Sequence, residues 1–259
     1  MSISKNDLAD LTYAKDLLEN PGLAAKITSL FGIPIEKGFK LLPARWSEAV
    51  LQAATASLHK ALHFAMMTID EKTKASSSNL IHKMIVAATG AAGGAFGLAA
   101  LSVELPVSTM IMLRSIADVA RSEGEEIKRI ETKLACLEVF ALGGKSRKGE
   151  TTETGYFTIR IALASSVADA VKYIAERGLA EKGAPLFVRL VSKIASRFSL
   201  VVSEKAAAQA VPLVGAAGGA LINTIFMDHF QNLARGHFIV RRIERMYGTE
   251  EVQRYYEEL

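Results

Sequence analysis

The sequence contains a single cysteine, Cys136, among its 259 residues. One cysteine excludes a disulfide within the chain, and it lies in the apolar stretch KLACLEVF with no histidine nearby to activate the thiol. We therefore expect Cys136 to be a core residue of a protein in a reducing compartment. The amino terminus also lacks the basic-then-apolar order of a secretory signal. We expect a cytoplasmic protein, placed at the inner face of the cell membrane if it associates with lipid.

A strong excess of charge of one sign is also absent. The chain carries 31 Lys and Arg against 27 Asp and Glu, which gives a net charge of +4. Without a polybasic segment, nucleic acid is not an expected partner. In contrast, 50% of the residues are hydrophobic and the mean hydropathy is +0.21. These values are high for a freely soluble protein, which predicts that some apolar surface contacts lipid or a protein partner.

Metal-binding and cofactor motifs are missing or incomplete. His59 and His63 have the four-residue spacing of a zinc-binding helix, but Lys60 stands where such a helix carries its glutamate base. The chain has no G-x-S-x-G, no Walker A and no dinucleotide-binding glycine pattern. We therefore predict no metal ion and no cofactor.

Apolar residues recur at three- and four-residue spacing along most of the chain, and strand-like alternation is scarce. This periodicity predicts an all-α fold. Prolines and glycines mark the expected ends of helices at 6–20, 43–70, 76–104, 106–123, 126–142, 154–178, 185–210 and 213–247. We expect a helical N-terminal extension at 1–42 and one all-α domain at 43–259. The polar, glycine-rich segment 143–154 would connect its halves, 43–142 and 154–248.

The segment GAAGGA occurs twice, at 90–95 and at 215–220. In each copy two glycines stand four residues apart, which gives a helix a flat groove where another backbone can approach. We therefore predict a helical bundle built from two related, glycine-rich helical hairpin units. Each copy lies in an uncharged run, of twenty residues before Glu104 and of twenty-two after Lys205. Such runs are either buried helices or a membrane-inserted hairpin, and their richness in Ala, Gly and Ser favours burial.

Three long segments resemble the EcsC family of bacterial proteins. They are LPVSTMIMLRSIADVARSEGEE at 105–126, ETGYFTIRIALA at 153–164 and VPLVGAAGGALINTIFMDHFQNLARGHFIVRRIERMYG at 211–248. The family takes its name from a protein encoded beside an ABC transporter, and its activity is not established. The resemblance therefore implies an accessory role, with a membrane protein such as a transporter as a candidate partner.

Two polar stripes interrupt helices that are otherwise largely apolar. Arg114, Asp118 and Arg121 recur at helical spacing, and the stripe that begins at Asp228 includes Arg235 in a similar arrangement. Such groups either tie helices together as ion pairs or form a pocket whose arginines bind an anionic head group or phosphate. The candidate ligand-binding residues are Glu104, Arg114, Asp118, Arg121, Asn223, Asp228, His229, Arg235 and His237.

The segment that follows Pro185 has an apolar face opposite a basic one, on which Arg189, Lys193 and Arg197 stand four residues apart. This arrangement is typical of a helix lying on an anionic lipid surface, and equally of a solvated basic face over a protein core. The three cations are the candidate membrane-surface residues, and an anionic lipid or membrane surface is the candidate partner.

These features favour a peripheral membrane-associated or lipid- and anion-binding accessory protein rather than an enzyme. Two alternatives stay open. One is a protease-like hydrolase that uses Asp228, His229 and Glu104, and the other is a protein-binding adaptor linked to an ABC transporter. The sequence does not determine the oligomeric state.

We predict that the protein binds anionic vesicles through the basic face. Each cation near an anionic surface contributes about 1 kcal/mol, so reversing Arg189, Lys193 and Arg197 to glutamate should weaken binding more than roughly tenfold, with thermal stability preserved. High salt should also weaken binding of the parent, because it screens the attraction. Co-sedimentation with neutral and anionic vesicles at low and high salt measures both effects. Equal pelleting of parent and triple variant would show that the face is solvated.

Overall fold

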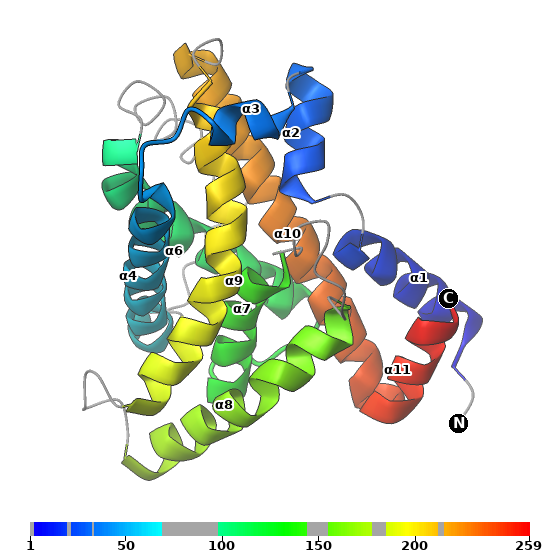
Figure 1. Ribbon diagram of the computed structural model, residues 1–259. Helices are drawn as coiled ribbons and strands as arrows, with labels where there is room; N and C mark the ends of the chain where they lie inside the picture. Colours follow the sequence, from blue (N-terminus) through cyan, green and yellow to red (C-terminus); the bar gives the residue numbers. More distant parts are fainter. Residues whose placement is uncertain are drawn as a thin grey trace.

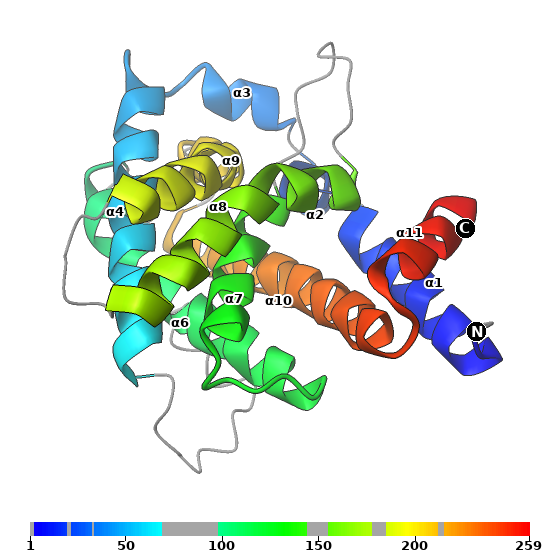
Figure 2. The same cartoon turned by 90° about the horizontal axis from the view of Figure 1, so that it is seen from below.

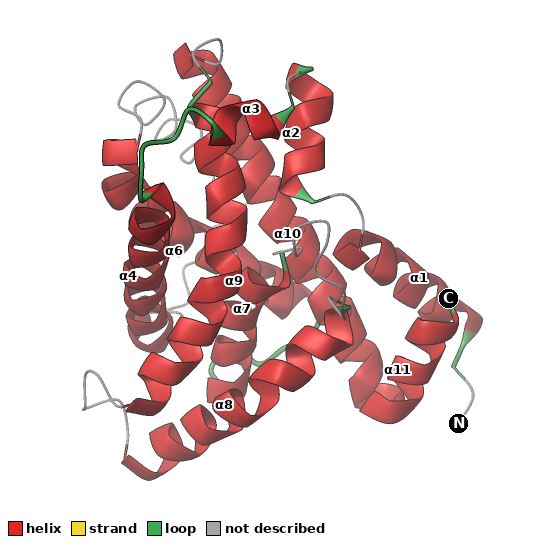
Figure 3. Cartoon of the chain, viewed as in Figure 1, coloured by secondary structure: helices red, strands yellow, loops and turns green. Residues whose placement is uncertain are grey.

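The computed structural model describes residues 3–19, 22–32, 34–68, 98–143, 155–177, 185–211 and 215–259. These residues form helices and no strand (Figure 3), which confirms the predicted all-α class. The helices are α1 (Lys5–Glu19), α2 (Leu23–Phe31), α3 (Ile35–Phe39), α4 (Trp46–Thr68), α6 (Leu98–Ser122), α7 (Ile130–Leu142), α8 (Tyr156–Arg177), α9 (Pro185–Gln209), α10 (Gly215–Tyr247) and α11 (Thr249–Glu258). The sequence pattern did not predict α2, α3 and α11.

The helices α9 and α10 lie side by side through the middle of the bundle (Figures 1 and 2). On one side α4 and α6 pack against each other, α4 also contacts α9, and α6 also contacts α10. The helices α7 and α8 contact each other and α9, while α1 and α11 cover the C-terminal half of α10. Every other helix is thus placed by its contacts with the central pair.

Phenylalanines from three helices form the centre of the core. Phe140 of α7, Phe198 of α9 and Phe230 of α10 have ring centroids 5.1 to 5.6 Å apart. Phe226 packs against the last two rings, and all four are fully buried. The apolar face of α9, from Phe187 to Val201, also lies in this core. Ring contacts of this kind fix how α7, α9 and α10 lie against one another.

The helix α6 runs without a break through Pro106, where the sequence predicts a boundary between two helices. A proline inside a helix lacks the N–H for one backbone hydrogen bond and costs about 3 kcal/mol. Here Leu105 and Leu113 on the same helix are fully buried, and their packing outweighs that cost. The predicted boundary is wrong, because tertiary packing overrides a local helix breaker.

The predicted repeat lies partly outside the described residues. Its first GAAGGA copy, at 90–95, lies outside them, whereas the second copy forms the first turns of α10. The uncharged run after Lys205 is divided between two helices, because α9 ends at Gln209 and α10 begins at Gly215. No helix in the described ranges is long and apolar enough to span a bilayer. The design of two hairpin units stays a prediction.

The helix α1 packs along α10, although the predicted boundary at residue 43 separates them. Gly236 makes this contact close, since a Cβ there would lie 2.7 Å from Leu18 Cγ. The Tyr247 hydroxyl also donates a hydrogen bond to Asp7 at 2.8 Å. These contacts join α1 to the body that contains α10. The division into an extension and a domain stays a prediction.

The helix α3 approaches α9 closely at one glycine. A Cβ built on Gly38 would stand 2.0 Å from the backbone carbonyl oxygen of Ala207. Only a residue without a side chain permits this approach of two backbones. The contact holds the connection between α3 and α4, residues 40–45, beside the C-terminal half of α9.

We predict that Gly38→Ala lowers the free energy of unfolding by about 3 kcal/mol, because the added methyl group would overlap backbone atoms that cannot move aside. Helix propensity alone would give the opposite sign, a gain of about 1 kcal/mol. Urea unfolding followed by circular dichroism distinguishes the two. Lys37→Ala, on the exposed side of the same helix, is the control and should change stability by about 0.5 kcal/mol or less. A stabilised Gly38→Ala would contradict the close contact.

Candidate functional site

Glu104, Lys205 and Asn223 meet between three helices. Lys205 Nζ of α9 lies 2.6 Å from Glu104 Oε1 of α6, and Asn223 Nδ2 of α10 donates to the same oxygen at 2.7 Å. The side chain of Lys205 is fully buried and that of Glu104 is 5% exposed. The ammonium also lies 4.8 Å from the centre of the Phe226 ring. One carboxylate oxygen thus joins α6, α9 and α10.

The two charges of this cluster depend on each other. Burial lowers the pKa of Lys205, and the adjacent Glu104 carboxylate partly offsets this effect. Either charge without its partner would be an uncompensated charge in the protein interior. The pair therefore holds the helices in place only while both groups are present.

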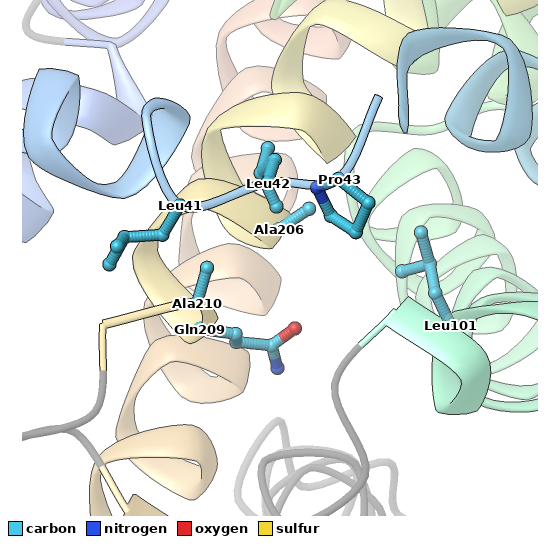
Figure 4. A pocket seen from close by; sticks show the side chains of 7 residues that line it. All are labelled: Leu41, Leu42, Pro43, Leu101, Ala206, Gln209 and Ala210. Atoms are coloured by element: carbon cyan, nitrogen blue, oxygen red, sulfur yellow. The ribbon is translucent and has the colours of Figure 1, made fainter. Parts of the chain in front are cut away.

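A cavity of about 250 Å³ lies near this ion pair, and Figure 4 shows the described residues that line it. Leu101 precedes Glu104 by three residues on α6, and Gln209 follows Lys205 by four residues on α9, so each shares a helix face with its charged neighbour. The third wall comes from the connection between α3 and α4. The lining residues are Leu41, Leu42, Pro43, Leu101, Ala206, Gln209 and Ala210.

Gln209 has the one polar side chain among these lining residues. Its amide nitrogen is buried and has no hydrogen-bond partner among the described residues. Figure 4 shows the amide extending from α9 into the space between Ala210 and Leu101. A buried donor that makes no hydrogen bond costs about 1 to 3 kcal/mol, so an acceptor on a ligand would be stabilising here.

A second buried polar cluster lies between α8 and α10. The Tyr156 hydroxyl and His237 Nδ1 are 2.9 Å apart, and both residues are almost completely inaccessible. Burial raises the pKa of Tyr156. Burial lowers the pKa of His237 well below its ordinary value, and the charges of Arg160 and Arg241 lower it further. The imidazole is therefore neutral at physiological pH.

Ion pairs surround this second cluster. Arg160 donates two hydrogen bonds to Glu244, at 2.7 and 2.9 Å, and Arg241 donates to Glu125 at 2.9 Å. Glu138 of α7 is buried near both arginines; burial raises its pKa, and the two positive charges offset only part of that rise. Because each arginine already contacts a carboxylate, the cluster fits a structural role in joining α7, α8 and α10.

A match to a known family covers almost all of this arrangement. The model of the EcsC protein family matches residues 6–243. The chain belongs to the EcsC family. No curated protein and no solved structure matches it at a significant level. The EcsC match begins within α1 and ends within α10, so it includes the cavity and most of both polar clusters.

Two of the candidate ligand residues of this EcsC chain, Glu104 and Asn223, meet in the cluster beside the cavity. Asp118 and Arg121 instead form an ion pair at 2.8 Å in which the arginine is 56% exposed. No hydrogen bond or ion pair joins Arg121 to α10 in the part of the chain that the structure describes. The other residues of the two predicted polar stripes, Arg114, Asp228 and Arg235, are half-buried. An arginine pocket for an anion stays a prediction.

The candidate hydrolase residues are Asp228, His229 and Glu104. His229 lies beside Gly143, where a Cβ would stand 2.7 Å from the imidazole Nε2. His237, a candidate ligand residue, belongs to the second cluster. Within the described ranges no hydrogen bond or ion pair joins Glu104 to Asp228 or His229. The same ranges hold no group of His, Cys, Asp or Glu side chains placed to bind a metal ion. The hydrolase alternative stays a prediction.

The basic face of α9 contacts its neighbours. Lys193 Nζ donates to the Ala162 carbonyl of α8 at 3.1 Å, and Arg197 Nε donates to the Ala141 carbonyl of α7 at 2.8 Å. Reversal of all three cations would also remove these hydrogen bonds. We therefore no longer expect the triple variant to keep its thermal stability. Arg189 is exposed, so Arg189→Glu tests the surface without this loss.

Lys205 and Gln209 are not among the site residues predicted from sequence. A signal for Lys205 exists, since the uncharged runs are bounded by Glu104 and Lys205, which have opposite charges. Charges at the ends of long uncharged runs have few neighbours in the sequence that could neutralise them. Gln209 gives no such signal, because an amide near the end of a helix is ordinary in a sequence.

We predict that Glu104→Gln lowers the free energy of unfolding by about 3 to 5 kcal/mol at pH 7, because it leaves the Lys205 ammonium buried without its carboxylate. The substitution also removes the charge that raises the pKa of Lys205, so this pKa falls further below 10.5. At pH values between the pKa of Lys205 in the folded variant and its pKa in the unfolded variant, the unfolded state binds one more proton. The stability of the Glu104→Gln variant therefore rises with pH in this range. The deficit should be smaller at pH 9.5 than at pH 7.

Urea unfolding at the two pH values measures this dependence. Glu251→Gln is the control, because it breaks the exposed ion pair between Glu251 and Arg254 and should leave stability nearly unchanged at both pH values. A Glu104→Gln deficit that is small, or that does not depend on pH, would contradict the buried pair.

Proposed function

We propose that this EcsC-family protein binds a small amphipathic molecule, with the hydrocarbon part of the molecule in the cavity between α6, α9 and the α3–α4 connection. The observation that carries the proposal is the composition of the cavity, whose described lining residues are three leucines, one proline, two alanines and one glutamine. Ligand sites in proteins are concave and mostly apolar, with few polar groups that orient the ligand. This cavity has that composition.

The volume of the cavity indicates how large the bound part is. Apolar cavities of about 150 Å³ are known to bind benzene, and one small group the size of water takes roughly 30 Å³. A volume of 250 Å³ therefore accommodates about eight carbon atoms. A medium-length alkyl chain or an aromatic ring with a short substituent fits this space.

The mouth of the cavity is itself apolar. Leu41 lines the cavity and is 54% exposed, and Pro43 beside it is exposed as well. Apolar residues that are both exposed and adjacent to a cavity favour a ligand that arrives from an apolar phase. Peripheral association with a membrane, where such a molecule would be taken up, is part of the same proposal.

Binding of an anion by the buried cations is supported less well. Lys205 already contacts Glu104, and Arg160 and Arg241 contact carboxylates in the second cluster. An incoming anion would have to displace a carboxylate that is itself buried, which is costly. An accessory role beside a membrane transporter rests on the family resemblance alone and names no residue of this chain.

Trp46, the single tryptophan, follows the lining residue Pro43 by three residues. We expect ethylbenzene and 1-octanol, which have eight carbons each, to bind saturably and to change the fluorescence of Trp46. Ala210→Phe should weaken both by at least about tenfold, because the ring would occupy the cavity. Fluorescence titration and isothermal calorimetry measure the affinities independently.

Ala164→Phe is the control, since it places the same ring on the exposed side of α8. It should bind both molecules like the parent. The proposal fails if the parent shows no saturable binding, or if Ala210→Phe binds as tightly as the parent.

A further inference from the structure

We infer that the polar end of the bound molecule is uncharged, an alcohol, amide or ester rather than a carboxylate or phosphate, and that Gln209 recognises it. The assignment rests on the proposed function, because both concern the ligand of one cavity. It adds the chemical class of the ligand and the residue that selects it.

Gln209 can hydrogen-bond such a group if its side-chain amide rotates toward the ligand. Its Nε2 is buried without a partner among the described residues, and no other described side chain that lines the cavity carries a nitrogen or oxygen atom. A side-chain amide offers two donors and one acceptor. It can therefore donate to a carbonyl or hydroxyl oxygen of the ligand and accept from a hydroxyl or amide group. A purely apolar ligand leaves the buried donor unsatisfied.

The charges near the cavity do not favour an anion. The nearest cation along α9, Lys205, is one helical turn from Gln209, fully buried and 2.6 Å from Glu104. The negative charge of Glu104 neutralises it. The lining residues that the structure describes include no lysine and no arginine. A carboxylate or phosphate that entered the cavity would lose its hydration without gaining a cation from these residues, whereas a neutral group loses much less on transfer from water.

The test compares molecules that share an eight-carbon size and differ at the polar end, by calorimetry at pH 8. Octanamide should bind at least about ten times more tightly than octanoate. In Gln209→Leu the affinity for octanamide should fall about tenfold, which corresponds to one lost hydrogen bond to a buried group. Ethylbenzene, which probes the cavity alone, should bind this variant like the parent. Gln209→Lys should bind octanoate more tightly than the parent does.

Two further molecules separate the sources of such a ligand. Monooctanoylglycerol represents the neutral ester of a membrane lipid, and 1-octanol represents a free alcohol. The inference is supported if monooctanoylglycerol or 1-octanol binds more tightly than octanoate. Whichever of the two binds more tightly shows whether the ligand comes from a membrane lipid or is a free alcohol. Gln253→Leu is the matched control, because Gln253 of α11 bonds to Glu257 far from the cavity along the chain, and this variant should bind every molecule like the parent.

Ethylbenzene distinguishes the failure of each proposal. If ethylbenzene does not bind the parent, the proposed function is wrong. If ethylbenzene binds while octanoate binds as tightly as octanamide, the uncharged class is overturned and the cavity stands as a binding site. Equal binding of octanamide by Gln209→Leu and the parent would overturn the role of Gln209.

Discussion

The contact between Glu104 and Lys205 sets the separation of α6 and α9, and the arrangement of the bundle around the cavity depends on it. The ends of the two charged side chains stay at hydrogen-bond distance, since a wider spacing of their helices leaves both charges uncompensated. Asn223 binds the same carboxylate oxygen and brings α10 to the junction. The cavity-lining side chains that follow Lys205 on α9 include Ala206 and Ala210, which are too small to fill the distance that the ion pair imposes. The cavity is a consequence of this spacing.

The two polar clusters differ in what lies beside their unpaired groups. Around Tyr156 and His237 the neighbouring arginines contact carboxylates, so the charges are matched within the fold, although His237 Nε2 is buried without a partner among the described residues. Near the Glu104 pair, the Gln209 amide nitrogen also has no partner among the described residues, and Gln209 lines the cavity. An unpaired polar group beside a cavity is one that a ligand can use. The adjacent cavity, rather than the number of charges, is the reason to propose a ligand for the first cluster.

The sequence predicts the helices well and the site only in part. Apolar periodicity gives α1, α4, α8, α9 and α10 to within three residues, because it reports directly which face of a helix is buried. It fails at Pro106, where the energy of packing decides, and this energy has no local pattern. Glu104 and Asn223 are predicted as site residues, but Lys205 is not. Lys205 and Glu104 are about a hundred positions apart, and their pairing depends on how α6 lies relative to α9. The spacing of residues along the sequence does not show this arrangement.

The contacts between α1 and α10 have a consequence for synthesis of the chain. Tyr247 and its partner Asp7 are 240 residues apart. Translation at roughly 5 to 20 residues per second places about 12 to 48 seconds between the appearance of these two residues. During that interval Leu11, Ala14 and Leu18 of α1, which are buried in the finished fold, have no α10 to cover them. The nascent chain therefore exposes a hydrophobic face that a chaperone can bind until the final helices leave the ribosome.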